Sequence, residues 1–471
     1  MRCSRFVWFG TAAILACSSL PENNVCAEKQ FCGQEQQKSE WESEKDLQVT
    51  PETGSVWDVS EEESGDSKSE SPVTSNMIPE SEDPKKDAWN YQQLEDGTLE
   101  ITGYIGIETE LIIPSEIEGK EVSSIGWYAF SNCNSLTAIQ FPEKLRRIGG
   151  AAFAGCNSLE EILLPESIEY IEDSAFAGCS NLQNIAVEDS NSDYMSQDGV
   201  LYSKDGEELI CCPGGKTDCL EVPEGVSSIG SWAFFRCKEL NNIILPKSVV
   251  KIGDYAFSEC RNLCDITFAE GLVNIGDYAF EGCSSLRKLL LPESVQSIGI
   301  GAFCYCSSLT DINFSKNVSS IGERAFSYCN SLLHIVADRE NPVYLSEDGI
   351  LYDKDKLTVI CCPGGKTGSF TVPEGICHIG NHAFSGCNSL RQVILPKGVT
   401  VIEDWAFSGC SNLIAVELPE SVIEIGKVAF SGCSSLKEFE LPDGVQVIGD
   451  YAFSGCSSLA DMIRDNNLSE S

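Results

Sequence analysis

The chain has 471 residues, of which 42% are hydrophobic, enough apolar material for a large folded core. Its 72 acidic and 32 basic residues give a formal net charge of −40. A surface this acidic repels phosphate backbones, so the composition argues against a nucleic-acid-binding protein. The charge instead favours a soluble protein with a self-repelling surface.

The N-terminus has the pattern of an export signal. Arg2 and Arg5 precede an apolar run at residues 6–17, and residues 25–27 offer a cleavage point, so we predict a signal peptide over residues 1–27. Alternatively, residues 14–17 resemble a bacterial lipobox, in which Cys17 would carry a lipid anchor. No other stretch is long and apolar enough for a transmembrane helix. We therefore expect a secreted or cell-surface protein, and the anchoring mode stays open.

Residues 28–87 form a second region of distinct composition. They hold 17 acidic and 6 basic residues, many serines and few aliphatic side chains. Such a segment buries too little apolar surface to offset its ordering entropy, so we predict an acidic disordered linker. It would act as a spacer between the folded region and a membrane or wall.

From residue 88 the chain repeats one unit of 23 residues. Residues 98–101 and 110–114 have the pattern of strands that would cap the first unit. A Phe then marks each unit, with a step of 23 within each of three runs: 130, 153 and 176; 234, 257, 280, 303 and 326; 384, 407, 430 and 453. A fixed period of this size indicates a stacked solenoid.

One unit is built from a strand, a bend and a turn. In residues 159–164 the alternation predicts a strand with Ile162 and Leu164 inward and the residues between them outward. Pro165 would end this strand because proline has no N–H to donate. Around residues 175–179 we expect a short helical turn that places Phe176 and Cys179 in the core.

The repeat resembles the BspA-like leucine-rich repeat family. The resemblance rests on Pro165, Ile171, Phe176, Cys179 and Leu182, whose pattern recurs in twelve copies over about four-fifths of the chain. It implies an α/β fold, a right-handed leucine-rich-repeat solenoid over residues 88–463, followed by a polar tail at 464–471. Such proteins are exported surface proteins associated with adhesion. The asparagine position of the usual repeat holds serine or glycine here, so no asparagine ladder is expected.

Two longer steps interrupt the period. Phe176 to Phe234 and Phe326 to Phe384 each span 58 residues, and the two inserts repeat each other 150 residues apart. Asp205 and Gly206 stand between two apolar segments, a pattern typical of a β-hairpin. We expect two hairpin inserts at the edge of the coils, which are either structural variants of the repeat or ligand contacts.

Two motifs resemble ligand-binding loops, but neither has the residue spacing that phosphate or calcium binding requires. Residues 214–217 imitate the end of a phosphate loop, but Ile210 stands at the position of the required glycine. Asp189, Asn191 and Asp193 have the spacing of the first calcium ligands of an EF-hand loop. The next residue of such a loop must be glycine, and it is Tyr194 here. We therefore expect no cofactor and no dedicated metal site.

Twelve cysteines recur with the repeat, one in each unit. Their spacing would permit coil-to-coil disulfides by distance, but buried free thiols acting as small hydrophobic side chains are the favoured interpretation. His378 and His382 occupy variable positions of the repeat, so we interpret them as surface residues and not as metal ligands. No nucleophile–histidine pair repeats a catalytic arrangement, so we expect no enzyme.

The remaining candidate site is the outward face of the repeated strand, which we expect to be concave. Its members mix apolar and polar side chains, which suits a protein or glycan better than a small molecule. They are Glu161, Leu163, Asn242, Ile244, Asp265, Thr267, Lys288, Leu290, Asp311, Asn313, Gln392, Ile394, Glu417 and Glu440. The predicted function is non-enzymatic adhesion to a host or neighbouring-cell macromolecule; the alternative is a structural surface component that assembles with itself.

Overall fold

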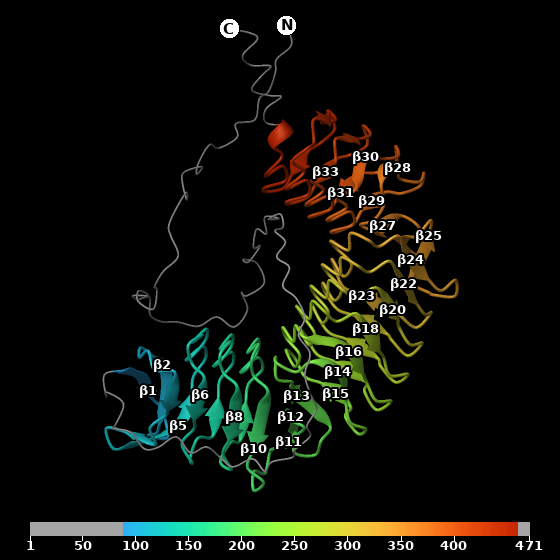
Figure 1. The fold of residues 1–471 in the computed structure, drawn as a ribbon. Coiled ribbons are helices and arrows are strands. Elements are labelled where there is room, and N and C mark those ends of the chain that lie inside the picture. Colours follow the sequence, from blue (N-terminus) through green and yellow to red (C-terminus); the bar gives the residue numbers. More distant parts are fainter. Residues whose placement is uncertain (1–87, 460–471) are drawn as a thin grey trace, which may run out of the picture. The chain divides into compact units, whose positions relative to one another are not determined.

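The computed structural model describes residues 88–459. They form coils that follow one another in chain order, from blue to red in Figure 1. The predicted signal peptide, the acidic linker, residues 460–463 and the polar tail lie outside the described residues.

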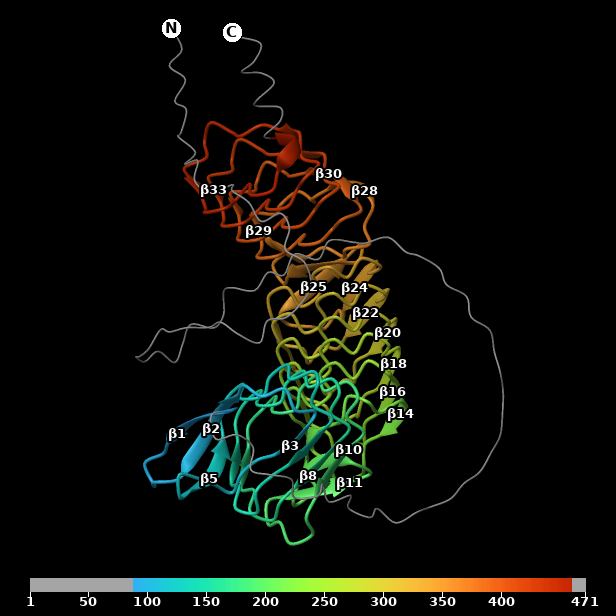
Figure 2. The ribbon, with the colours of Figure 1, turned by 60° about the vertical axis from the view of Figure 1, so that its left-hand side comes forward.

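Each coil contributes one strand to a ladder of parallel strands, which we call the long-strand ladder. In the regular coils, hydrogen-bonded partners are 23 residues apart, as for Asn242 and Asp265, so the sequence period is the length of one coil. Several of these strands run along one side of the stack (Figure 2). The ladder comprises β3 (Glu110–Ile112), β6 (Ala138–Gln140), β8 (Glu161–Leu164), β10 (Asn184–Val187), β14 (Asp218–Glu221), β16 (Leu240–Ile244), β18 (Asp265–Thr267), β20 (Lys288–Leu290), β22 (Asp311–Phe314), β24 (His334–Ala337), β28 (Gly368–Thr371), β30 (Leu390–Ile394), β32 (Ala415–Glu417) and β34 (Glu438–Phe439).

A second ladder follows the bend after each proline, and we call it the short-strand ladder. Most of its strands have two residues, of which the second is a buried isoleucine such as Ile252 or Ile275. The regular members are β7 (Arg147–Ile148), β9 (Tyr170–Ile171), β15 (Ser228–Ile229), β17 (Lys251–Ile252), β19 (Asn274–Ile275), β21 (Ser297–Ile298), β23 (Ser320–Ile321), β29 (His378–Ile379), β31 (Val401–Ile402), β33 (Glu424–Ile425) and β35 (Val447–Ile448).

An antiparallel pair covers the N-terminal edge of the short-strand ladder. Strand β1 (Trp89–Gln93) pairs with β2 (Leu99–Tyr104), which runs parallel to β5 (Lys120–Ile125), and β4 (Glu116–Ile117) pairs with β5. The buried Trp89 ring lies 4.6 Å from Tyr104 and 6.3 Å from Phe130. Its indole shields the first Phe of the repeat from water, which is what a capping element must do.

The inserts are built into the short-strand ladder. In the first insert, β11 (Tyr194–Gln197), β12 (Val200–Ser203) and β13 (Glu208–Cys211) pair antiparallel in turn, and β13 then runs parallel to β15. In the second, β25 (Tyr344–Glu347), β26 (Ile350–Asp353) and β27 (Thr358–Cys361) repeat this arrangement before β29. Strands β12 and β13 form the expected antiparallel pair around Asp205 and Gly206, and each insert supplies the first three strands of its sheet.

The core is a column of phenylalanine rings with a column of thiols beside it. The rings of Phe257 and Phe280 stack at 4.9 Å with an interplanar angle of 9°, and neighbouring rings within each of the three runs of Phe residues also stack. Cys283 Sγ donates a hydrogen bond to the Phe257 carbonyl oxygen at 3.1 Å, a bond that recurs along the column. The buried cysteines of this column are free thiols. Burial raises the pKa of the Cys283 thiol, which keeps it protonated and unreactive.

The expected helical turn around residues 175–179 is wrong. Ser174 and Gly178 have φ angles of 61° and 72°, left-handed values that a right-handed helix cannot contain. The segment instead forms successive tight turns, and the Phe153 amide in the preceding coil donates to the Ala175 carbonyl at 2.8 Å. The α/β label therefore does not fit: helix is nearly absent from residues 88–459, with 457–459 forming a single short turn. Within those residues, no helix is long and apolar enough to cross a membrane.

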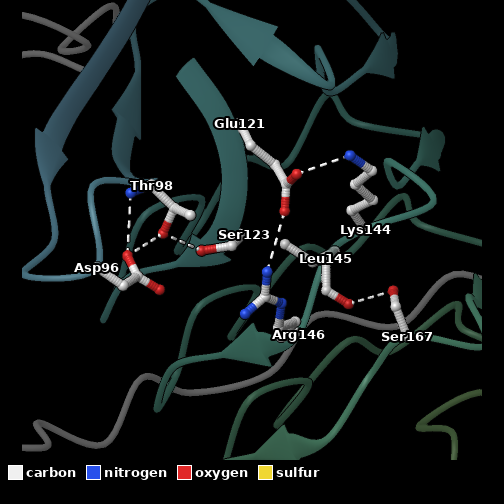
Figure 3. Close-up of polar contacts among 8 residues, drawn as sticks. All are labelled: Asp96, Thr98, Glu121, Ser123, Lys144, Leu145, Arg146 and Ser167. Carbon is white, nitrogen blue, oxygen red and sulfur yellow. Dashed lines mark hydrogen bonds and ion pairs between the residues drawn. The ribbon is translucent and has the colours of Figure 1, made fainter.

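Side chains add bonds between neighbouring coils (Figure 3). Ser167 Oγ donates to the Leu145 carbonyl at 2.6 Å, and Ser248 and Ser294 make the same bond. At the equivalent position of the next coil, Asn317 Nδ2 donates to the Glu293 carbonyl at 2.9 Å. On the surface, Glu121 accepts bonds from Lys144 at 2.8 Å and from Arg146 at 3.1 Å. These exposed ion pairs add little stability, and the backbone ladders hold the coils together.

Candidate functional site

The structure places the fourteen predicted face residues on the outward side of the long-strand ladder or directly beside it. Ten are exposed, and the other four, Asn242, Asp311, Gln392 and Ile394, are partly covered. Their inward neighbours, such as Ile243 and Ile312, are fully buried. The alternation of the strand therefore puts each predicted side chain on the expected side, because successive residues of a strand face opposite ways.

The two inserts divide these residues into separate groups. Asn242 pairs with Asp265 and Ile244 with Thr267 on β16 and β18, whereas Glu161 and its neighbour Leu163 lie on β8 before the first insert. The strands form four hydrogen-bonded sets, β3 to β10, β14 to β18, β20 to β24 and β28 to β34, of which the second and third are separate although no insert lies between them. In the last set, Gln392 Nε2 donates to Glu417 Oε1 at 2.6 Å.

The third set carries the best-defined surface, which we call the β20–β24 patch. One row across its strands is polar and consists of Lys288, Asp311 and His334. His334 Nδ1 lies 2.9 Å from Asp311 Oδ1, and this hydrogen bond is the main cause that lowers the pKa of the Asp311 carboxyl. The patch thus offers an anchored carboxylate between two basic side chains.

The second row of the β20–β24 patch is largely apolar. Leu290, Asn313 and Val336 stand side by side across the strands, and Leu290 is 81% exposed and Val336 43%. An isolated exposed apolar side chain is common, but aliphatic side chains two strands apart beside a polar row resemble the mixed surface of a protein interface.

The predicted set omitted two members of this patch, His334 and Val336. A signal for both is present in the sequence, because residues 332, 335 and 337 repeat the Leu, Ile and aliphatic spacing of residues 159, 162 and 164. The long step to the next Phe concealed this strand, which belongs to an ordinary coil although an insert follows it.

Among the EF-hand-like residues, Asn191 holds the insert against the preceding coil by hydrogen bonds. Asn191 is 1% exposed; its Nδ2 donates to the carbonyls of Pro165, Glu166 and Ile168, and its Oδ1 accepts from the amides of Asp193 and Tyr194. Asn341 makes the corresponding bonds in the second insert. Among the described residues, no group of three or more His, Cys, Asp or Glu side chains is arranged to hold a metal ion.

The phosphate-loop-like residues have a structural role as well. Gly214 and Gly215 lie so close to the preceding coil that an added Cβ would meet the Cys179 carbonyl oxygen at 2.6 Å and the Leu182 oxygen at 2.8 Å. Lys216 Nζ donates to the Asp198 carbonyl at 2.7 Å and closes the turn between β11 and β12. The glycines permit close approach of the backbones, and the lysine holds the turn of the insert.

Each insert leaves a cleft beside the Ala–Phe turns. The insert contributes no such turn of its own; Cys212 instead donates its amide to the Ala233 carbonyl at 2.8 Å, so Ser174 and Trp232 face each other across a gap. The first cleft has a volume of about 350 Å³. The equivalent cleft of the second insert, between Arg324 and His382, has about 190 Å³.

His382 differs from the surface residue that we expected. It lines the second cleft half-buried and stacks on Trp405 at 5.6 Å. Burial, together with the positive charge of Arg324, lowers the pKa of the His382 imidazole to about 4. The imidazole is therefore neutral at physiological pH.

The sequence matches the family model described as a BspA type leucine rich repeat region over residues 109–199, 214–333 and 361–470. A leucine-rich cell-surface protein from Faecalibacterium prausnitzii is 28% identical, with 82% of this chain and 88% of that chain covered and a TM-score of 0.47. A leucine-rich repeat protein from Bacteroides ovatus is 26% identical, with 79% and 92% covered and a TM-score of 0.35. The pneumococcal vaccine antigen PcpA is 19% identical, with 76% and 82% covered and a TM-score of 0.39.

A search of curated protein sequences found no match to this chain. Because the TM-scores of these structures fall below 0.5, the family model alone carries the assignment. Its matches span more than half of the chain, and the twelve Phe positions recur with the same period. The chain belongs to the BspA-type leucine-rich repeat family.

Proposed function

We propose that this protein is an exported, non-enzymatic binding protein that contacts a protein or glycan on a host or neighbouring cell. The observation that supports the proposal is the β20–β24 patch, where Leu290 and Val336 are exposed beside the anchored Asp311 carboxylate. Burying the two aliphatic side chains against a partner would supply affinity, and the polar row would supply specificity.

The experiment compares patch variants of the repeat protein on an array of matrix proteins, mucins and glycans. We expect Leu290→Glu combined with Val336→Glu to weaken binding about tenfold or more, because charges would replace buried apolar contacts. Val250→Glu is the matched control, since Val250 is exposed to a similar degree outside the long-strand ladder. Unchanged binding by the double variant, or no binding to the array by the unmodified protein, would contradict the proposal.

Self-assembly is the second candidate function, and the last coil favours it. Val447 and Ile448 of β35 are 49% and 46% exposed, whereas the equivalent Ile425 of the preceding coil is fully buried. Among the described residues, β34 and β35 also end their ladders. A second molecule docked there would cover these side chains and pair the strand edges. Sedimentation over a concentration series tests this function, and a monomer at all concentrations would exclude it.

We further propose export through residues 1–27, with Cys17 as the lipid attachment site if the protein is anchored. The support is the charged and apolar pattern of the sequence alone, since these residues lie outside the described part. Mass spectrometry of the mature N-terminus distinguishes the two forms. An unmodified chain that begins after residue 27 would exclude the lipid anchor, and an uncleaved chain that begins at Met1 would exclude both forms.

A further inference from the structure

The two clefts are copies of one structural feature with different charge. Equivalent positions lie 150 residues apart, so Ser174, Glu208 and Trp232 of the first cleft correspond to Arg324, Thr358 and His382 of the second. Five carboxylates and no basic side chain line the first cleft, while Arg324 and His382 join two carboxylates in the second. The two clefts therefore share one backbone arrangement, but the side chains that line the first are acidic and those that line the second include two basic groups.

An aromatic ring forms one wall of the first cleft. Trp232 stacks on Tyr255 of the following coil at 4.2 Å and 11°, and Phe235 meets it edge-on at 4.8 Å. The preceding coil carries Ser174 and not an aromatic ring at the equivalent position, so we infer that the indole face opposite Tyr255 borders the cleft. The exposed face of an indole attracts cations through its π electrons.

Two carboxylates stand near this wall, and the positive charge of Lys251 offsets part of the pKa increase of each. Asp173 and Glu208 are exposed at the cleft, and neither forms an ion pair within residues 88–459. Partial desolvation is the main cause that raises the pKa of each carboxyl, and Ser231 provides the hydrogen bond that Asp173 accepts. A bound cation would relieve this unfavourable environment.

The chain itself places guanidinium groups in comparable surroundings. At the rim of the first cleft, Arg147 lies over the Tyr170 ring at 5.4 Å and pairs with Glu172, and both partners line the cleft. Beside the second cleft, the Arg324 guanidinium lies over Tyr278 at 5.6 Å. An aromatic face beside a carboxylate therefore already holds an arginine at the rim of the first cleft.

We propose that the first cleft binds the guanidinium or ammonium group of a basic side chain on a partner protein. The cation would lie between the free face of Trp232 and the carboxylates of Asp173 and Glu208. The inference extends the proposed binding function with a separate site and does not depend on the β20–β24 patch. The second cleft would not bind this group, because Arg324 and His382 replace the serine and tryptophan.

The test uses the full chain and Nα-acetyl-arginine methylamide as the probe, with the neutral citrulline analogue as control. Titration calorimetry at low salt, where screening is weak, should show one site with at least about tenfold preference for the arginine compound. Equal binding of the two compounds, or no binding of either, would overturn the proposal. Because no macromolecular partner is required, this result is independent of the array experiment.

Variants that copy residues of the second cleft into the first locate the site. Ser174→Arg introduces the residue that the second copy carries at the same left-handed position, with φ angles of 61° and 52°, and should abolish binding without unfolding the coil. Glu208→Thr should weaken binding at least about fivefold, whereas the control Glu207→Thr alters the same charge outside the cleft and should not. Equal losses for Glu207→Thr and Glu208→Thr would indicate only non-specific attraction and refute the site.

A gain of function completes the test and remains informative if Ser174→Arg proves unstable. Arg324→Ser, Thr358→Glu and His382→Trp together rebuild the first cleft at the second position. We expect the stoichiometry of arginine binding to rise from one to two sites. A folded triple variant that still binds one probe molecule would show that these residues do not form the site.

Discussion

Acid should weaken the coil that contains His382, and the effect can be isolated by one substitution. His382 packs against Trp405, and its buried Nδ1 has no hydrogen-bond partner among the described residues. Protonation would place a second cation near Arg324 in a site with little water. We propose to replace His382 by tyrosine, which occupies the equivalent position 255 with the same φ of 55°.

The magnitude follows from the shift in the His382 pKa. The folded pKa of about 4 lies below the ordinary value of 6.5, so folding favours the neutral imidazole. The stabilisation is complete above pH 6.5 and is lost as the pH falls from 6.5 to 4. Linkage between these two values predicts that His382 alone removes roughly 2.4 kcal/mol of unfolding free energy between pH 7 and pH 4.5.

The assay is urea denaturation of the unmodified protein and of His382→Tyr at both pH values. The difference between the two proteins isolates the imidazole, since carboxylates such as Glu281, whose pKa burial raises, titrate in both. Nuclear magnetic resonance of the imidazoles provides a direct check, because the chain has only three histidines. Equal loss of stability by the two proteins, or an imidazole at position 382 that titrates near pH 6.5, would refute the reasoning.

Two further substitutions test the roles assigned to repeated polar groups. Cys283→Ala should lower the unfolding free energy by about 1–2 kcal/mol, because it leaves a small cavity and removes the bond to the Phe257 carbonyl. The exposed Cys264→Ala is its control, and equal thermal shifts for both would contradict a role of the buried thiol. Asn191→Ala should cost roughly 2–4 kcal/mol, since it leaves buried carbonyls and amides without partners. Calorimetric melting compared with the exposed control Asn241→Ala checks this, and a loss below about 0.5 kcal/mol would exclude a fastening role.

Much of the coil could be predicted because the same positions recur at a fixed spacing. Phe257 and Cys283 are fully buried as expected, and Ile162 and Leu164 face inward with Leu163 outward. The local alternation of a strand fixes which side of the coil each residue occupies. The outward placement of the fourteen candidate residues follows from the same rule, whereas their role in binding stays a prediction.

The conformation of the turn at residues 174–178 and the existence of the two clefts could not be predicted from local sequence patterns. Ser174 adopts a left-handed conformation because its segment bonds to neighbouring coils, as Phe153 does to Ala175, and a local pattern of side chains does not reveal that constraint. The clefts join Ser174 to Trp232, and Asn381 Nδ2 donates to Glu323 Oε1 at 3.0 Å across 58 residues. These neighbours exist only because an insert without an Ala–Phe turn separates the coils.

The sequence by itself determined the period, the family and the division of each coil into buried and exposed residues, since burial repeats with every copy of the unit. The tertiary structure decided which exposed residues meet. His334 contacts Asp311 because stacking brings positions 23 residues apart into register, and Trp232 presents a free indole face because the preceding coil lacks the ring that would cover it. Side-chain direction is a local property of a strand, whereas the composition of a surface depends on which coils lie next to each other.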